Sequence, residues 1–408
     1  MENQDYRRKI EDVVKYNGPK STLETLLEVY EKVKGEYRDV KGEYRDEVSI
    51  DGVRKVIYTV EDELKLLLSE INYSEKDISN LVATAQMWDL DEKGSKAFGA
   101  YVGSLITILT ERNEAEGKRT IIKIDENRLD YLGYYCRKFD LVWFGVNKGD
   151  SVFAYAKDGN ELYVERCEGD EFAECAGSNG GHVGKIIADR VDGNWFAIGA
   201  RHVGKIRADI VNGKGFACGA GSRMGGYVGE ISAVVVDGEG FASAAGSDSG
   251  HVDKIRANTV NGKGFAYYAG SFDGHVDEIS ADFVKGELFA GLAGWKDGRV
   301  DKISVGFVKG DRFAERAGCR SWYVGEISAN FVKGDRFAAL AGSNGAVKKI
   351  RANRVDGKYF AYDASAYGIC VRKISEEAKA TMNPCQRIKG LDAPVAIVIG
   401  DCAEEAEK

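Results

Sequence analysis

The chain repeats itself about every 24 residues over more than half of its length. An isoleucine marks each repeat, at spacings of 20, 25, 24, 24, 24, 24, 23 and 24 residues, at the positions Ile186, Ile206, Ile231, Ile255, Ile279, Ile303, Ile327, Ile350 and Ile374. A valine lies three residues before each isoleucine, and in all but the last repeat a glycine follows at seven residues and Phe-Ala at ten and eleven. Repetition at a fixed period predicts a stack of similar units rather than one globular core.

The repeat unit, V-x-x-I-x-A-x-x-V-x-G-x-x-F-A-x-x-A-G, predicts β structure, because it alternates in short stretches and is too short for a helical hairpin. About 24 residues suit one coil with two or three short strands, and coils stacked at roughly 4.8 Å would bury columns of valine, isoleucine and phenylalanine. The 50 glycines and 3 prolines suit many strands joined by sharp bends. We therefore expect a mainly β fold, a right-handed parallel β-helix solenoid of about 24-residue coils.

Helical spacing of apolar residues is confined to the N-terminal part of the chain. Helices are expected from a capping box at Ser21 and Glu24, over Val60–Ile71, from near Ser74, and over Ser95–Arg112. The last is apolar on nearly all sides, so we expect it to be buried against the open end of the solenoid, which needs a cap.

Three regions follow from these patterns. Residues 1–116 are expected to form an α-helical N-terminal region and cap, residues 117–375 the β-helix repeat domain, and residues 376–408 a C-terminal cap or tail.

Composition restricts the partners and the compartment. A formal charge of −8 argues against binding to nucleic acid or to an anionic membrane. The N-terminus has no secretory signal, and the longest apolar stretch, Phe98–Leu109, is too short to span a bilayer. The eight cysteines include no CxxC pair, so most are expected to be reduced and the protein to be cytoplasmic.

The steps I-x-A, V-x-G and A-G resemble the GXGXG β-helix domain found at the C-terminal end of glutamate synthase large subunits and in one of the subunits of formylmethanofuran dehydrogenase. The resemblance is strongest over Leu129–Gly177, where Asp130-Tyr131-Leu132-Gly133-Tyr134 is followed by Gly-Asp in each coil, and it extends more loosely over the next two hundred or so residues. The later coils are longer and place phenylalanine where the family places glycine. The resemblance implies a structural spacer and transfers no catalytic residue.

All four histidines lie in one column of the repeat, four residues before the isoleucine. In two neighbouring coils an aspartate follows two residues later, on the same side of the strand, which gives His251, Asp253, His275 and Asp277. This set is a candidate site for a divalent metal, and the alternative is a solvated ladder of ordinary hydrogen bonds. No other cofactor is expected.

Two further columns point outward. The residue before each isoleucine alternates in charge, which favours correct pairing of neighbouring strands, through Lys205, Glu230, Lys254, Glu278, Lys302, Glu326 and Lys349; the alternation stops at Lys185 and Lys373. Four residues after the isoleucine, Phe283, Phe307 and Phe331 form an aromatic stripe. It is expected either to contact a partner or to be covered by residues 376–408, in which Val395–Ile399 could form a covering strand.

The sequence contains no motif of a known hydrolase, nucleotide-binding or metalloprotease site, so no catalytic residue is predicted. The leading hypothesis is a non-enzymatic scaffold or assembly subunit that binds a protein partner or itself. One alternative is a metal-dependent or carbohydrate-active β-helix enzyme, for which the candidate carboxylates are Asp248, Asp253, Asp273 and Asp277. Another, which the resemblance suggests, is a non-catalytic subunit of a redox complex.

Overall fold

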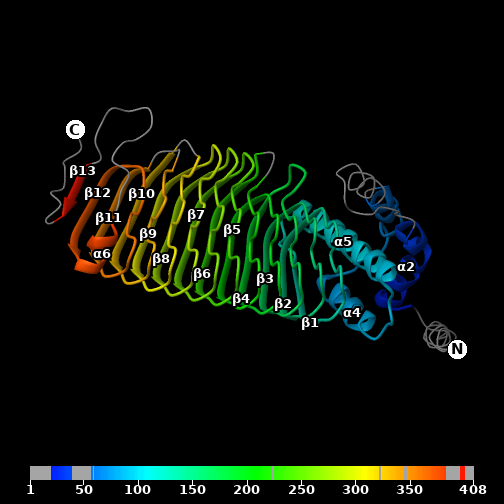
Figure 1. Cartoon of the computed structure of the whole chain (residues 1–408). Helices are drawn as coiled ribbons and strands as arrows, with labels where there is room; N and C mark the ends of the chain where they lie inside the picture. Colours follow the sequence, from blue (N-terminus) through cyan, green and yellow to red (C-terminus); the bar gives the residue numbers. More distant parts are fainter. Residues whose placement is uncertain are drawn as a thin grey trace.

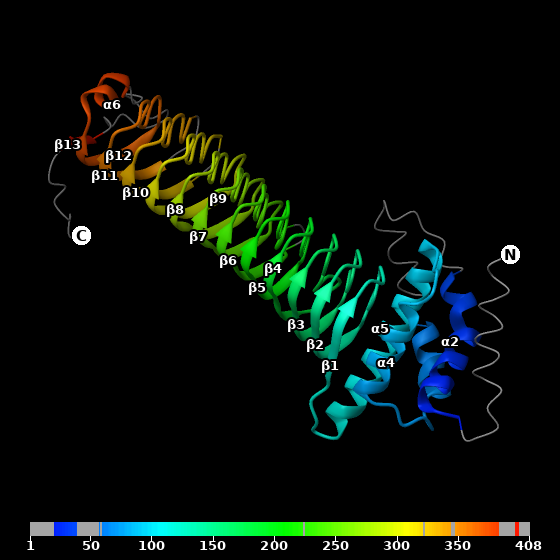
Figure 2. The ribbon, with the colours of Figure 1, turned by 90° about the horizontal axis from the view of Figure 1, so that it is seen from below.

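The fold is a parallel β-solenoid with helices at its N-terminal end (Figure 1), seen in a computed structural model that describes residues 20–38, 57, 59–222, 225–320, 323–343, 347–382 and 396–399. All described strands belong to one 13-stranded sheet in which each strand pairs in parallel with the next along the chain. Figure 2 shows the strands stacked along one side of the rod and the connecting turns along the other. The mainly β fold with coils of about 24 residues is as predicted.

The strands are mostly nine or ten residues long. They are β1 Ile121–Asn127, β2 Lys138–Asn147, β3 Asp158–Cys167, β4 Val183–Val191, β5 His202–Val211, β6 Tyr227–Val236, β7 His251–Val260, β8 His275–Val284, β9 Arg299–Val308, β10 Tyr323–Val332, β11 Val347–Val355, β12 Ala366–Ile374 and β13 Ala396–Ile399.

The burial pattern of strands β4–β11 indicates that each of them bends twice around the core. In β7, the buried side chains are Val252, Ile255, Ala257 and Val260. These inward positions are three, two and three residues apart, whereas a straight strand would bury every second residue. Two adjacent residues therefore face outward at each bend, which creates the outer columns that carry the candidate sites.

The return half of each coil is not a strand, although two or three strands per coil were predicted. Its backbone alternates in the sign of φ, as at Ala217 (51°) and Gly219 (64°). The amide of Ala217 donates to Phe196 O in the preceding coil (2.7 Å), and that of Gly219 to Ser243 O in the next (2.8 Å). Among the described non-glycine residues with positive φ there is no Val, Ile or Thr, which agrees with the strong steric penalty on β-branched side chains there.

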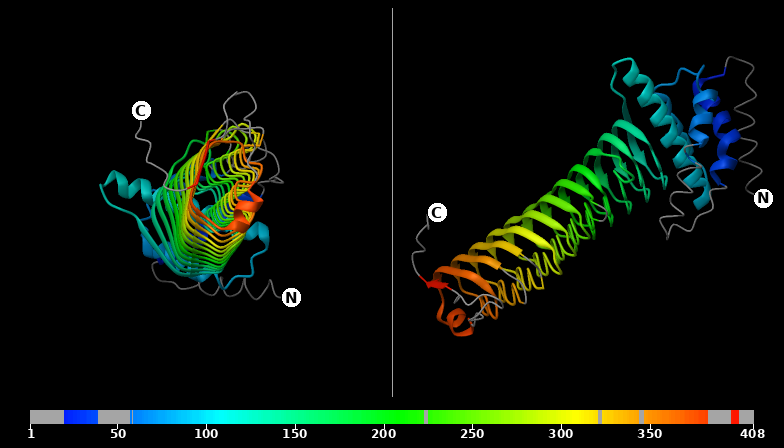
Figure 3. Two further views of the ribbon diagram at one scale, coloured as in Figure 1. Left: turned by 60° about the vertical axis from the view of Figure 1, so that its left-hand side comes forward. Right: turned by 90° about the horizontal axis from the view of Figure 1, so that it is seen from above.

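A column of stacked phenylalanines fills the core on the return side. Neighbouring rings lie 4.7–5.3 Å apart at 3–9° between planes, in the order Phe172, Phe196, Phe216, Phe241, Phe265, Phe289, Phe313, Phe337 and Phe360. The stack agrees with the predicted interior column and holds the coils at a common spacing. Figure 3 shows the coils superposed when the rod is viewed nearly along its axis.

The strand register corrects the last repeat. Ile350 pairs with Ile369 rather than Ile374, and Ile374 pairs with Val355. The final coil is therefore 19 residues long from Ile350 to Ile369, like the 20-residue coil from Ile186 to Ile206. Lys373 accordingly lies beside Arg354, outside the alternating charge column.

Helices α2 (Thr22–Arg38), α4 (Glu75–Ala85) and α5 (Glu92–Ala115) lie at the β1 end of the rod (Figure 2). The predicted capping box at the start of α2 is present, because Ser21 N donates to Glu24 Oε2 (2.7 Å) and Glu24 N to Ser21 Oγ (3.2 Å). The expected helix over Ser95–Arg112 is longer at both ends and corresponds to α5.

Helices α4 and α5 cover the end of the solenoid at β1, and α4 supplies hydrogen-bond donors to the unpaired edge of that strand. Ser79 Oγ donates to Lys123 O (2.7 Å) and Gln86 Nε2 to Glu126 O (2.6 Å), both on the outer edge of β1. Helix α5 packs so closely that a Cβ at Gly99 would lie 1.9 Å from Tyr131 O. Unpaired strand edges invite aggregation, so these contacts protect this end of the sheet.

A buried ion pair joins the helices to the first coil. Glu61, in the helical residues 59–67, is 1% exposed, and its Oε1 lies 3.1 Å from Arg137 Nη1 and 3.7 Å from Lys65 Nζ. Burial raises the pKa of the Glu61 carboxyl to about 7, against the lowering effect of Arg137 and Lys65.

This pKa predicts a pH dependence of stability. The folded chain holds the Glu61 proton more tightly than the unfolded chain, in which the carboxyl titrates near 4.5. The free energy of unfolding should therefore fall between about pH 4.5 and 7, by on the order of 3 kcal/mol at most. Glu61→Gln should remove this component and be the more stable form at pH 8 in urea denaturation. Identical pH profiles for the two proteins would contradict it.

The described C-terminal residues extend the sheet rather than cover its outer face. Strand β13 pairs with β12 from Gly368 and Ala396 to Val371 and Ile399. Helix α6 (Glu376–Thr381) lies against the last coil, where Tyr359 N donates to Thr381 Oγ1 (2.8 Å). The expectation that Val395–Ile399 covers the phenylalanine stripe is wrong for residues 396–399; Val395 lies outside the described residues.

Candidate functional site

Each histidine of the column lies at the start of its own strand: His202, His251 and His275 are first residues, and His182 directly precedes β4. His202, Tyr227, His251, His275 and Arg299 are partners in successive parallel pairs, so they lie one above another on neighbouring coils. The following valine in each coil is buried, which turns the side chains before and after it outward.

The structure brings three of the four predicted metal ligands together. One ring nitrogen of His251, one ring nitrogen of His275 and one carboxylate oxygen of Asp277 all lie within 4.8 Å of one another. The Asp277 Oδ1 atom is 3.6 Å from His251 Nε2 and 3.3 Å from His275 Nε2. The two imidazole rings meet edge to face at 4.7 Å between centroids, and all three residues are half-buried.

The fourth predicted ligand, Asp253, lies beside this group. Its Oδ1 is 2.9 Å from His251 Nε2, and its Oδ2 accepts a hydrogen bond from the Tyr227 hydroxyl (2.5 Å). That hydrogen bond raises the pKa of Tyr227. On the other side, Asp301 lies 3.4 Å from His275 Nε2 and accepts from Arg299 Nε (2.6 Å).

The carboxylates considered for sugar chemistry fall into two places. Asp253 and Asp277 lie on strands, whereas Asp248 and Asp273 lie in corner turns with φ of 52° and 60°. Within the described part of the chain, no hydrogen bond joins the corner pair to the strand pair.

The phenylalanine stripe is part of a longer apolar column. Phe283 and Phe307 stack at 5.0 Å and Phe307 and Phe331 at 4.8 Å, and all three side chains are half-buried. Strand pairing continues the column through Thr259 and Val235 to Ile210. It ends in a basic residue on each side, Arg190 and Arg354.

The alternating charges lie directly opposite one another, as predicted. Lys205 Nζ is 2.9 Å from Glu230 Oε2, and Lys302 Nζ is 3.2 Å from Glu278 Oε1. The two residues of each ion pair are also direct partners in the parallel sheet, which supports a structural role in setting the strand register.

The comparisons with known proteins identify no relative. No family model matches the chain, and neither a curated protein nor a solved structure is similar to it at a significant level. In the part of the chain that the structure describes, no helix combines the length and the apolar character needed to cross a bilayer.

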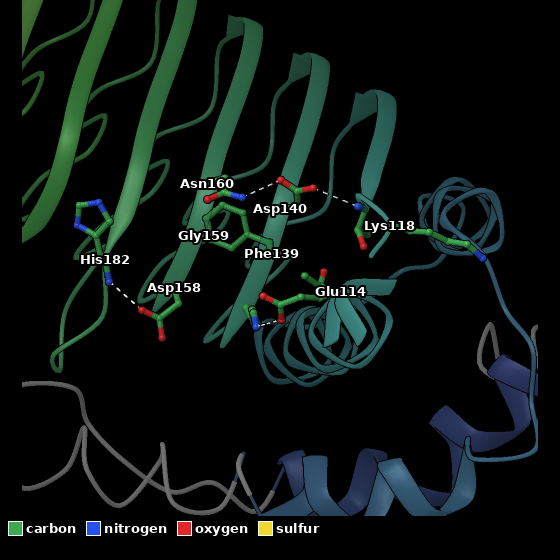
Figure 4. Close-up of a pocket in the computed structure, with 11 residues that line it drawn as sticks. Glu114, Lys118, Phe139, Asp140, Asp158, Gly159, Asn160 and His182 are labelled. Carbon is green, nitrogen blue, oxygen red and sulfur yellow. Dashed lines mark hydrogen bonds and ion pairs between the residues drawn. The ribbon is translucent and has the colours of Figure 1, made fainter. Parts of the chain in front are cut away.

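Sequence reasoning missed an open cleft of about 290 Å³ between α5 and the first coils (Figure 4). Its lining includes Glu114, Lys138, Asp140, Asn160 and His182. Glu114 pairs with Lys138, and Asn160 Nδ2 donates to Asp140 Oδ1 (2.9 Å). These residues come from segments far apart in the sequence, so no local motif predicts the cleft. Because its described acids and bases are largely paired with one another, it presents little unmatched charge to a ligand.

A second missed feature is an aromatic cluster on the corner turns. Trp295 contacts the rings of Tyr268 (5.7 Å) and Phe272 (5.2 Å), and Lys296 Nζ lies 4.6 Å from the Trp295 ring. The only sequence signal is that Trp295 replaces the serine that begins this turn in the two preceding coils, at Ser247 and Ser271.

The cysteines do not form a reactive site in the described residues. Cys136 and Cys167 are buried and free, and burial raises the pKa of each thiol to about 12, so neither is a ready nucleophile. Cys175, Cys218 and Cys319 are likewise not disulfide-bonded, whereas Cys370 takes part in a disulfide bond. Five of the eight cysteines are thus not disulfide-bonded, which agrees with the expectation that most are reduced, and Cys370 is an exception to it.

Proposed function

We propose that this protein is a non-enzymatic scaffold or assembly subunit that binds a protein partner, or a second copy of itself, through the outer surface of the solenoid. The observation that carries the proposal is the column from Ile210 to Phe331, apolar at every position except Thr259 and named here the Phe stripe. It crosses six neighbouring coils, from Ile210 through Val235, Thr259, Phe283 and Phe307 to Phe331.

The Phe stripe has the properties of a contact surface. At roughly 4.8 Å per coil it is about 24 Å long, comparable to one side of a modest protein interface. Ile210 is 37% exposed, and the three phenylalanines keep part of their rings open to solvent. Large side chains gain little by lying on an outer face unless another surface covers them, so an apolar column of this length favours a binding role.

Basic side chains lie against two of the aromatic rings of the Phe stripe. Arg354 lies 5.0 Å from the ring of Phe331, and Lys285 Nζ lies 5.5 Å from the ring of Phe283. Aromatic residues next to arginine are typical of the residues that dominate binding energy at protein interfaces. Because Arg354 already pairs with Asp356 and Arg190 with Asp192, we infer a partner surface that is apolar at its centre and assign no charge to its rim.

The resemblance to GXGXG β-helix domains supports a spacer or assembly role of the same kind. A non-catalytic place in a redox complex remains within this proposal, as does a cytoplasmic location. The resemblance over Leu129–Gly177 supports the place in a redox complex, and eight cysteines without a CxxC pair support the cytoplasmic location.

Site-specific photo-crosslinking on the full chain tests the proposal. A benzophenone amino acid at position 307 should form one dominant adduct in cells, either with a partner protein or with a second copy of the chain. The same probe at Trp195, which is 41% exposed on the return side, is the matched control. Phe331→Lys should abolish the adduct from position 307, because it places a charge in the contact.

The proposal fails if positions 307 and 195 give the same set of adducts, or if Phe331→Lys leaves the adduct from position 307 unchanged. Light scattering on the purified chain separates the two acceptable outcomes, since a self-associating chain would show twice the monomer mass.

A further inference from the structure

We propose that His251, His275 and Asp277 form a binding site for one divalent transition-metal ion of the zinc class, independently of the Phe stripe. The site would use Nε2 of both imidazoles and one carboxylate oxygen. Two nitrogen ligands and one oxygen ligand on adjacent coils leave a fourth position for water or a ligand from a partner.

The distances between the ligand atoms suit such an ion. Zinc bonds of 2.0–2.1 Å in a tetrahedron place neighbouring ligand atoms about 3.3–3.4 Å apart. Asp277 Oδ1 lies 3.3 Å from His275 Nε2 and 3.6 Å from His251 Nε2. The remaining separation, between one ring nitrogen of each imidazole, is at most 4.8 Å, so metal binding would require the two half-buried rings to approach each other.

The charge around the site favours a cation. Three aspartates, Asp253, Asp277 and Asp301, lie on successive coils in contact with the two histidines. Among the described residues, the permanently charged cation that contacts these three aspartates is Arg299, which forms an ion pair with Asp301. With neutral histidines, this group therefore carries two unmatched negative charges, and Asp277 has only histidines as described ion-pair partners.

The repeat itself shows that these aspartates depart from the local pattern. The position two residues before the isoleucine is glycine in most other coils, for example Gly229 and Gly325. A Cβ at those two glycines would lie 2.6 Å and 2.2 Å from a carbonyl oxygen of the preceding coil. Three successive coils instead carry a carboxylate in this column, and each of the three contacts one of the two histidines.

The neighbouring groups suit an outer shell. Asp253 is held by the Tyr227 hydroxyl and Asp301 by Arg299, so both carboxylates are oriented before a metal binds. In the structure, Asp253 Oδ1 lies 2.9 Å from His251 Nε2, within hydrogen-bond distance. Metal binding would require the Nε2 lone pair, with the imidazole proton on Nδ1, and would leave Asp253 as a hydrogen-bond acceptor for metal-bound water.

Cobalt titration of the full chain, after treatment with a chelator, tests this site. Co²⁺ is the probe because a four-coordinate site gives visible absorption bands that surface binding does not. We expect one Co²⁺ per chain, displaced by Zn²⁺. His275→Ala and Asp277→Asn should each weaken binding by about tenfold or more. His202→Ala is the matched control, since it removes a histidine from the same column where the next outward residue is Gly204.

A second readout guards against misfolding of a variant. Zn²⁺ should raise the thermal midpoint of the unmodified chain and of His202→Ala, but not that of Asp277→Asn, whose midpoint without metal should match the unmodified chain. Absence of the visible bands in the unmodified chain would overturn the proposal. So would equal Co²⁺ affinity in Asp277→Asn and His202→Ala, which would show ordinary surface binding to histidine.

Discussion

Replacing Gly262 with alanine is expected to destabilise the solenoid by about 3 kcal/mol or more. A Cβ at this position would lie 1.8 Å from Gly238 O and 2.8 Å from the carbonyl carbon of the same residue. Both atoms are backbone of the preceding coil, so they cannot move without separating two coils. The midpoint of urea denaturation, followed by circular dichroism, measures the effect.

Gly264→Ala is the matched control in the same coil. Gly264 has a φ of +74°, but the nearest atom to an added Cβ is 3.8 Å away. Equivalent positions in later coils hold Leu288 and Arg312, also with positive φ. The loss should therefore be only about 1 kcal/mol, the usual cost of a left-handed non-glycine residue. Equal destabilisation by the two substitutions would contradict the proposed contact between coils.

Phe265→Ala is expected to cost about 3–5 kcal/mol, because it removes a fully buried ring from the middle of the aromatic column. Phe265 is 1% exposed and stacks on Phe241 at 4.9 Å and on Phe289 at 4.7 Å. The resulting cavity is closed by rings fixed to neighbouring coils, so it cannot collapse easily. Urea denaturation of the purified chain gives the change.

Phe307→Ala separates burial from stacking. Phe307 also stacks on two phenylalanines, at 5.0 and 4.8 Å, but it lies on the outer face. Because the ring leaves no closed cavity, the expected loss is about 1 kcal/mol, of the order of aromatic pairing alone. If Phe265→Ala and Phe307→Ala cost the same, the assignment of inner and outer columns would be wrong.

The repeat made much of the solenoid predictable. The valine, isoleucine and phenylalanine columns fix which side chains face inward, and the charge alternation from Lys205 to Lys349 fixes the register of neighbouring coils. The conformation of the return half was not predictable, because Phe-Ala-x-x-Ala-Gly carries no signal for backbone that alternates in the sign of φ. Ile374 misled the alignment because a valine also lies three residues before it, whereas the register is set by Ile369.

The candidate sites were predictable only as columns. Sequence spacing places His251, His275 and Asp277 on one face, but rotamers decide that Asp253 turns to Tyr227 while Asp277 lies between the two imidazoles. The cleft beside α5 and the aromatic cluster at Trp295 depend on contacts between distant segments. The periodic pattern of the sequence does not predict those contacts.

The most direct test of the solenoid and its outer columns is a set of distances between spin labels carried on non-natural amino acids at positions of the Phe stripe and its ends. Labels at 190 and 307, 190 and 331, and 190 and 354 are separated by five, six and seven strand pairings. Pulsed electron paramagnetic resonance should give distances of about 24, 29 and 34 Å, rising by roughly 4.8 Å per coil. Distances that do not rise by one constant step per repeat would contradict the stacked coils and the continuous stripe on which the proposed function rests.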